Sequence, residues 1–60
     1  MTSASLIAFR KRMGWSQTQA AEELGCSRRA LQTYEQPGGK VPKVVALACA
    51  AKVYGLPPLE

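Results

Sequence analysis

Two adjacent arginines and a glutamine one helical turn later could do the most specific chemistry in this sequence. They are Arg28, Arg29 and Gln32. Arginine can donate two parallel hydrogen bonds to guanine O6 and N7 and also binds phosphate, whereas glutamine pairs with adenine N6 and N7. In a helix over residues 28–36, Gln32 lies on the same face as Arg28. The pattern favours a nucleic-acid target, with an ordinary solvated polar face as the alternative.

The position of the two arginines adds to this interpretation. Positive charge in the first turn of a helix opposes the helix dipole and costs roughly 0.3–1 kcal/mol when exposed. A sequence shaped by stability alone would sooner place Asp or Glu there. The arginines therefore indicate an anionic or guanine-bearing partner.

Capping residues and apolar spacing predict the elements that hold this face in place. Gly14 and Gly25 are typical helix ends, Ser16 and Gln19 fit a capping box, and Ser27 is a natural N-cap. The predicted helices cover residues 5–13, 17–24, 28–36 and 42–54, followed by an extended tail over 55–60. No strand pattern of period two occurs, so the sequence predicts an all-α fold, a compact bundle of four or five short helices.

Length and composition bound the function. Sixty residues make one domain, and a net charge of +4 favours a polyanionic partner. The chain has no histidine, no aspartate and no CxxC motif, so we expect no enzyme activity, no metal site, no cofactor and no small-molecule ligand. The longest apolar run, residues 44–51, is far short of a membrane span of ~20 residues, so no membrane partner is expected.

The two central predicted helices have the spacing of a helix-turn-helix unit. Residues 17–24 and 28–36 are separated by a short turn containing Gly25, and the small Ala21 would let the helices cross closely. Any small helical bundle also needs such a turn, which is the structural alternative. The arginines that open the second helix favour the helix-turn-helix.

With these residues in place, the sequence resembles the Xre/Cro/CI-type helix-turn-helix regulators of phages and bacteria. The resemblance covers about residues 6–56 and implies a lambda-repressor-like bundle with helix 28–36 in the major groove. It is carried by a set of matching positions: Arg10, Gly14, Ser16-Gln17, Ala21, Gly25, Ser27, Leu31, Tyr34-Glu35, Gly38 and Pro42 through Gly55-Leu56.

The resemblance also implies roles for individual residues. The base-reading positions fall on Arg28, Arg29 and Gln32. The positions that contact phosphate fall on Gln17, Thr33, Gln36, Gly39 and Lys40. For Gln17 a helix-cap contact is the alternative. For the glycine, simple turn geometry is an equally good explanation.

Arg10 and Glu35 are given a different role by the same resemblance. It implies that they form a largely buried ion pair that braces the first and third helices. Both residues would then be absent from the DNA surface.

The last predicted helix departs from the family pattern because it has two apolar stripes. Val44, Leu47, Ala48 and Ala51 form one, and Val45, Cys49 and Val53 form the other. Either the helix is buried on both sides, or the second stripe meets another subunit. On the latter hypothesis a homodimer forms through the helix end and the tail, with Val53, Leu56 and Leu59 at the interface.

The sequence therefore predicts a regulator that binds double-stranded DNA sequence-specifically in the bacterial cytosol. We expect a repressor that binds an inverted-repeat operator as a homodimer. The alternative is a protein-interaction module whose helix-turn-helix does not read DNA. RNA binding is a weaker alternative, because the sequence lacks exposed aromatic platforms.

Overall fold

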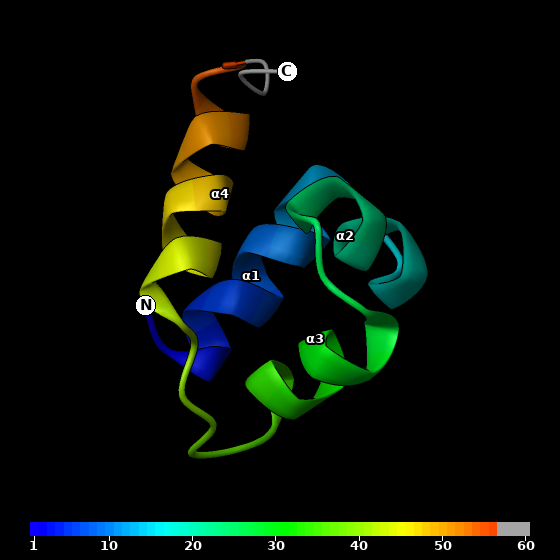
Figure 1. Cartoon of the computed structure of the whole chain (residues 1–60), viewed down its shortest axis with the longest axis vertical. Helices are drawn as coiled ribbons and strands as arrows, with labels where there is room; N and C mark the ends of the chain where they lie inside the picture. The colour runs from blue at the N-terminus through cyan, green and yellow to red at the C-terminus, as the bar shows by residue number, and fades with distance from the viewer. Residues whose placement is uncertain (57–60) are drawn as a thin grey trace.

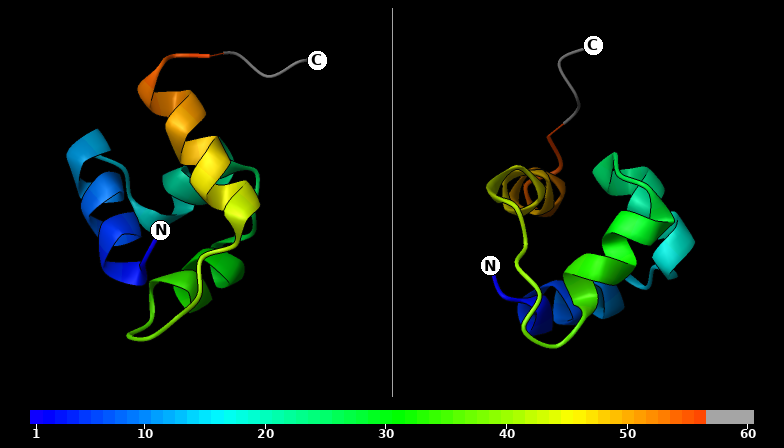
Figure 2. Two further views of the ribbon diagram at one scale, coloured as in Figure 1. Left: turned by 90° about the vertical axis from the view of Figure 1, so that its left-hand side faces the viewer. Right: turned by 60° about the horizontal axis from the view of Figure 1, so that its bottom comes forward.

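The computed structural model describes residues 1–56 of the chain. Four α-helices follow one another: α1 (Ser3–Met13), α2 (Gln17–Leu24), α3 (Arg28–Glu35) and α4 (Lys43–Val53). Helix α2 packs against both α3 and α4, and α1 packs against α3. Figure 1 shows α4 on one side of the molecule and the α2–α3 pair on the other, and the right-hand view of Figure 2 shows the same separation. The prediction of an all-α bundle is confirmed.

Local capping explains where the helices begin. The hydroxyls of Thr2, Ser16 and Ser27 accept hydrogen bonds from the backbone N–H three residues later, at 3.1, 3.1 and 3.0 Å. Each of these bonds satisfies a backbone donor that a helix start would otherwise leave without a partner. Because Thr2 supplies the first cap, α1 begins at Ser3, two residues before the predicted start.

The other helix ends differ slightly from the prediction. Gly14 and Gly25 end α1 and α2 in the left-handed conformation, with φ of 74° at both. Helix α3 ends at Glu35, since Gln36 has turned to an extended conformation. Pro42 is also extended, with ψ of 147°, so it caps α4 instead of forming its first residue.

A small core lies where the four helices meet. Its buried residues are Leu6, Ala20, Ala21, Leu31, Val45 and Cys49. The alanines let α2 approach its neighbours closely, and Phe9 and Trp15 cover the core with their rings edge to face, 5.7 Å apart. One short backbone feature closes the structure: an antiparallel bridge between Thr2 and Lys40 holds the N-terminus beside the loop that precedes α4.

Helix α4 buries a single stripe, which corrects the expectation for this helix. Val45 and Cys49 face the core, with Val45 5% exposed, whereas Val44 is 70% exposed and Leu47 is 60% exposed. Burial on both sides is therefore wrong, and so is the assignment of the Val45–Cys49 stripe to another subunit. The physical reason is that α4 packs on its neighbours from one side only within the described residues, and nothing there covers its outer side.

No helix among residues 1–56 combines the length and the apolar character that crossing a membrane requires. The predicted interface residue Leu59 lies outside the described residues, as does most of the predicted tail.

Candidate nucleic-acid interface

Helices α2 and α3 are joined by a tight turn that fixes their crossing. The N–H of Cys26 donates to the carbonyl of Ala21 at 2.9 Å, and the N–H of Gly25 donates to that of Glu22 at 3.3 Å. This pattern is the glycine-capped helix end in which the last carbonyls are satisfied by residues beyond the helix. Ser27 then starts α3 immediately, so three residues separate the two helices. The unit is a helix-turn-helix in geometry as well as in spacing.

Helix α3 divides cleanly into a buried and an exposed face. Leu31 and Glu35 are buried, and Ala30 and Tyr34 are half-buried. The exposed face consists of the polar and cationic residues of the prediction: Arg28, Arg29, Gln32 and Thr33, continued by Gln36. The first turn of α3 contains no acid to neutralise the arginines.

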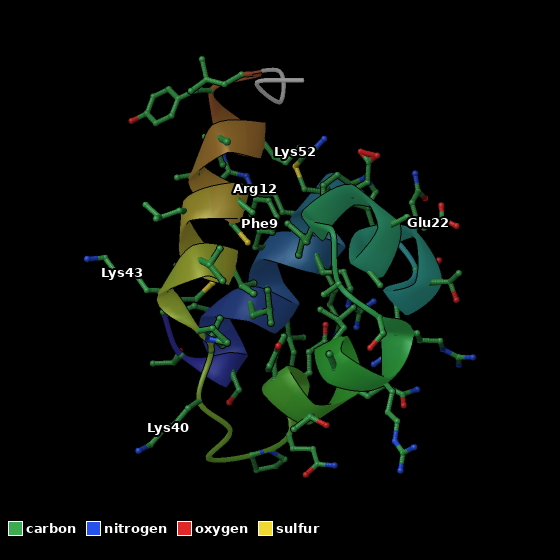
Figure 3. The ribbon with its side chains drawn as sticks, in the orientation of Figure 1. Phe9, Arg12, Glu22, Lys40, Lys43 and Lys52 are labelled. Carbon is green, nitrogen blue, oxygen red and sulfur yellow. The ribbon has the colours of Figure 1, made fainter. Side chains whose placement is uncertain are left out.

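The distribution of acids keeps this face positive. Among residues 1–56 the acids are Glu22, Glu23 and Glu35. Glu22 and Glu23 lie on α2, where Figure 3 shows Glu22 near the outer edge of the helix, and Glu23 accepts from Lys52 of α4 at 3.4 Å. Glu35 is turned inward. No exposed acid of the described chain therefore lies on α3.

A bidentate ion pair holds the inner face of α3 to α1. Arg10 Nε lies 2.7 Å from Glu35 Oε2, and Nη2 donates to Oε1 at 3.2 Å. The third guanidinium nitrogen donates to the carbonyl of Trp15 at 3.1 Å. The two side chains are 16% and 6% exposed, so the pair is mostly withdrawn from water. Parallel bonds of this kind are the strongest geometry that an arginine and a carboxylate can adopt.

The structure uses the side chain of Gln17 internally. Its Nε2 donates to Glu35 Oε1 at 3.1 Å, and its Oε1 accepts from Gln32 Nε2 at 3.4 Å. Gln17 therefore joins the buried ion pair to the exposed face of α3. Sequence reasoning named all four residues of this chain but gave no signal of the connection, which exists only because α1, α2 and α3 meet here.

Two of the predicted phosphate contacts have their donors engaged. The hydroxyl of Thr33 donates to the carbonyl of Arg29 at 3.1 Å, and the N–H of Gly39 donates to the carbonyl of Gln36 at 2.8 Å. A phosphate oxygen only accepts hydrogen bonds, so neither group is free to bind one as it stands. Lys40, in contrast, is exposed, and Figure 3 shows its side chain extending away from the bundle.

Gly39 has a steric reason to be glycine. A Cβ at this position would lie 2.8 Å from the carbonyl oxygen of Thr33 and 2.9 Å from that of Gln36. These oxygens belong to the end of α3 and the residue after it, and backbone cannot move aside cheaply. The close turn after α3 therefore accounts for this glycine, which was the alternative explanation.

The two cysteines supply no reactive group. Burial raises the pKa of the Cys49 thiol, and the neighbouring Cys26 raises it further. Burial likewise raises the pKa of Cys26. Both side chains are therefore neutral thiols that behave as small apolar residues. No cluster of three or more potential metal ligands occurs in the described part of the chain.

Comparison with models of known protein families gives a match, over residues 4–60, to a family described as a helix-turn-helix domain. The chain belongs to this family. The match covers nearly the whole sequence, and it confirms the resemblance to Xre-like regulators that the residue pattern indicated. No curated protein matches the chain, and no solved structure does. Helix-turn-helix domains of this family are typically DNA-binding and non-enzymatic.

Proposed function

We propose that this helix-turn-helix domain is a sequence-specific regulator of transcription that reads double-stranded DNA with α3 in the major groove. The observation that carries the proposal is the division of α3. Its inner face is fixed by the Arg10–Glu35 pair, and its outer face presents Arg28, Arg29 and Gln32 to solvent. A rigid helix with guanidinium and amide groups on its free face has the chemistry that base edges require.

The contacts are assigned by chemistry and exposure. Arg28 and Arg29 read guanine, and Gln32 reads adenine. Two exposed residues that follow α3 bind the DNA backbone and set the register of the helix. They are Lys40 and Gln36, the latter through its side-chain amide. Thr33 and Gln17 join the phosphate contacts only if their present hydrogen bonds are exchanged, and Gly39 shapes the turn.

The regulator acts as a homodimer on an inverted repeat. A single module of this kind buries only ~600–1,000 Å² against DNA, and two recognition helices ~34 Å apart would read half-sites one helical turn apart. The surface that we assign to the second copy is the outer side of α4 and its end. It carries Val44, Leu47, Val53, Tyr54 and Leu56, all exposed.

This surface suits a second copy of the chain because it is apolar. A two-fold axis brings the same residues of both copies together, so a patch without charge at its centre meets no like-charge repulsion. The basic residues Lys43 and Lys52 flank it. Binding of the dimer at an operator in the bacterial cytosol would block transcription, which makes the regulator a repressor.

The experiment that tests this function is selection of binding sites from random duplex DNA, followed by binding assays across a salt series. We expect an inverted repeat with guanines in each half-site. Affinity should fall steeply with salt, because each neutralised phosphate releases a condensed cation.

The exposed apolar side of α4 also supports a second candidate, a protein-interaction module that does not read DNA. The same selection separates the two. Failure to bind duplex DNA at low salt would reject the regulator and favour the interaction module.

A further inference from the structure

A chain of hydrogen bonds runs from the core to the exposed face of α3. It begins at Arg10, passes through Glu35 and Gln17, and ends at Gln32. We propose that Gln17 is a positioning residue, which holds the amide of Gln32 in the orientation that selects adenine. The inference rests on the proposed function, and it makes base preference depend on a side chain that touches no base.

The orientation of Gln17 follows from what it faces. The carboxylate of Glu35 is already held by two donors of Arg10 and can only accept hydrogen bonds. The end of the Gln17 amide that lies 3.1 Å from Glu35 Oε1 must therefore be the NH₂ group. A flipped amide would set its oxygen against a carboxylate oxygen, which is repulsive. Gln17 must consequently point its own oxygen outward.

The orientation of Gln32 follows in turn. The outward oxygen of Gln17 is an acceptor, so the group of Gln32 that approaches it, at 3.4 Å, must be NH₂. One of the two Nε2 hydrogens is then committed to Gln17. The side chain has one N–H and its oxygen left for DNA.

One donor and one acceptor are the complement of adenine, which offers N7 as acceptor and N6–H as donor. Guanine offers two acceptors, N7 and O6. Its O6 would therefore lie against the oxygen of Gln32, and two acceptors repel each other. An unanchored glutamine could avoid this conflict by turning both NH₂ hydrogens toward guanine. Anchoring by Gln17 removes that option, and it also fixes the side chain before DNA arrives.

The test compares Gln17→Met with the parent chain. Methionine has nearly the same length and volume but cannot hydrogen-bond to either partner. We expect the preference for adenine over guanine, at the one operator position that Gln32 contacts, to fall about tenfold, within the usual range for one bidentate base contact. Affinity is measured on operators that differ at that position alone, at a temperature where every variant is folded.

Two further variants make the result specific. Gln32→Ala should lose the preference at the same position, and adding Gln17→Met to it should change the preference no further. The matched control is Gln19→Met, the same substitution at an exposed position of α2, which should leave the preference intact. Nuclear magnetic resonance gives a readout without DNA: the Gln32 side-chain amide signals should move to exchange-averaged positions in Gln17→Met, and remain unchanged in Gln19→Met.

The outcomes separate this inference from the proposed function. If the parent selects an operator but Gln17→Met keeps the adenine preference, or weakens binding equally at all bases, the positioning role is wrong and the regulator stands. Gln32→Ala without any change in base preference would overturn the inference as well. If the parent selects no DNA sequence, both fail.

Discussion

Helices α3 and α4 each turn one face toward the core and one toward solvent, but their solvent faces are opposite in chemistry. That of α3 carries two arginines and polar residues, whereas that of α4 carries Val44 and Leu47, with the exposed Val53 at the helix end. A cationic face next to solvent has a natural partner in DNA, and an apolar one has a natural partner in another apolar surface. This contrast assigns DNA recognition to α3 and dimerisation to α4.

The two helices also differ in how they are held. The inner face of α3 combines an apolar anchor, Leu31, with the charged anchor Glu35. The inner face of α4 is held by Val45 and Cys49, and at its edge by the exposed Lys52–Glu23 pair. Exposed pairs of this kind contribute ~0–1 kcal/mol, so α4 depends almost wholly on apolar packing. Substitutions on the two inner faces should therefore act through different physical effects.

The largest effect is expected on the charged anchor of α3. Arg10→Ala leaves Glu35 buried without its partner and should lower the free energy of unfolding by ~3–5 kcal/mol, enough to unfold much of so small a domain. Urea denaturation followed by circular dichroism measures this. Arg12→Ala, at an exposed position on the same helix, is the control and should unfold like the parent. If both variants unfold alike, the pair does not anchor α3.

A neighbouring pair of valines tests the anchor of α4. Val45→Ala removes buried methyl groups and should cost about 2 kcal/mol of stability, from lost burial and the cavity left behind. Val44→Ala removes the same atoms from an exposed position and should change stability by less than ~0.5 kcal/mol. Thermal melting of both variants at one low protein concentration gives the comparison. Equal losses would mean that the outer side of α4 is covered in solution.

The outer face of α3 should affect binding and not folding. Arg28→Ala should weaken operator binding by ~1–3 kcal/mol and relax the preference for guanine at one position, with an unchanged melting temperature. Fluorescence anisotropy with labelled operator measures the affinity. Arg12→Ala again serves as control, because Figure 3 shows Arg12 in the upper half of the view, whereas α3 lies at the bottom. A similar loss in both variants would reduce the role of Arg28 to general charge attraction.

The smallest effect on the folded chain itself is expected at the end of α4. Val53→Asp places a charge at an exposed position, so the free energy of unfolding of the monomer should change by less than ~0.5 kcal/mol. The dimer should nevertheless dissociate, because the two-fold axis brings the two charges together. Sedimentation equilibrium compares it with Thr18→Asp, an exposed control on α2. A Val53→Asp chain that stays dimeric would exclude this surface.

The sequence alone was sufficient to predict the local features of this domain. Caps such as Ser16 and Ser27 act on backbone groups three residues away, and Gly14 and Gly25 end helices by their own conformational freedom. The helices could therefore be placed to within two residues. The division of α3 was also predictable, because its polar and apolar residues alternate with the helical period. The family resemblance added the pairing of Arg10 with Glu35, two residues that lie far apart in the sequence.

Only the tertiary structure decided which side of α4 is buried. Both of its stripes are apolar, so the pattern offers no contrast, and the choice depends on contacts with helices distant in sequence. The same holds for Gln17, whose amide is engaged by Glu35 and Gln32, partners that no local rule identifies. Helix caps and helical periodicity can be predicted from the sequence because they depend on neighbouring residues. Which acceptor a side-chain donor binds depends on distances that the packing of the helices sets.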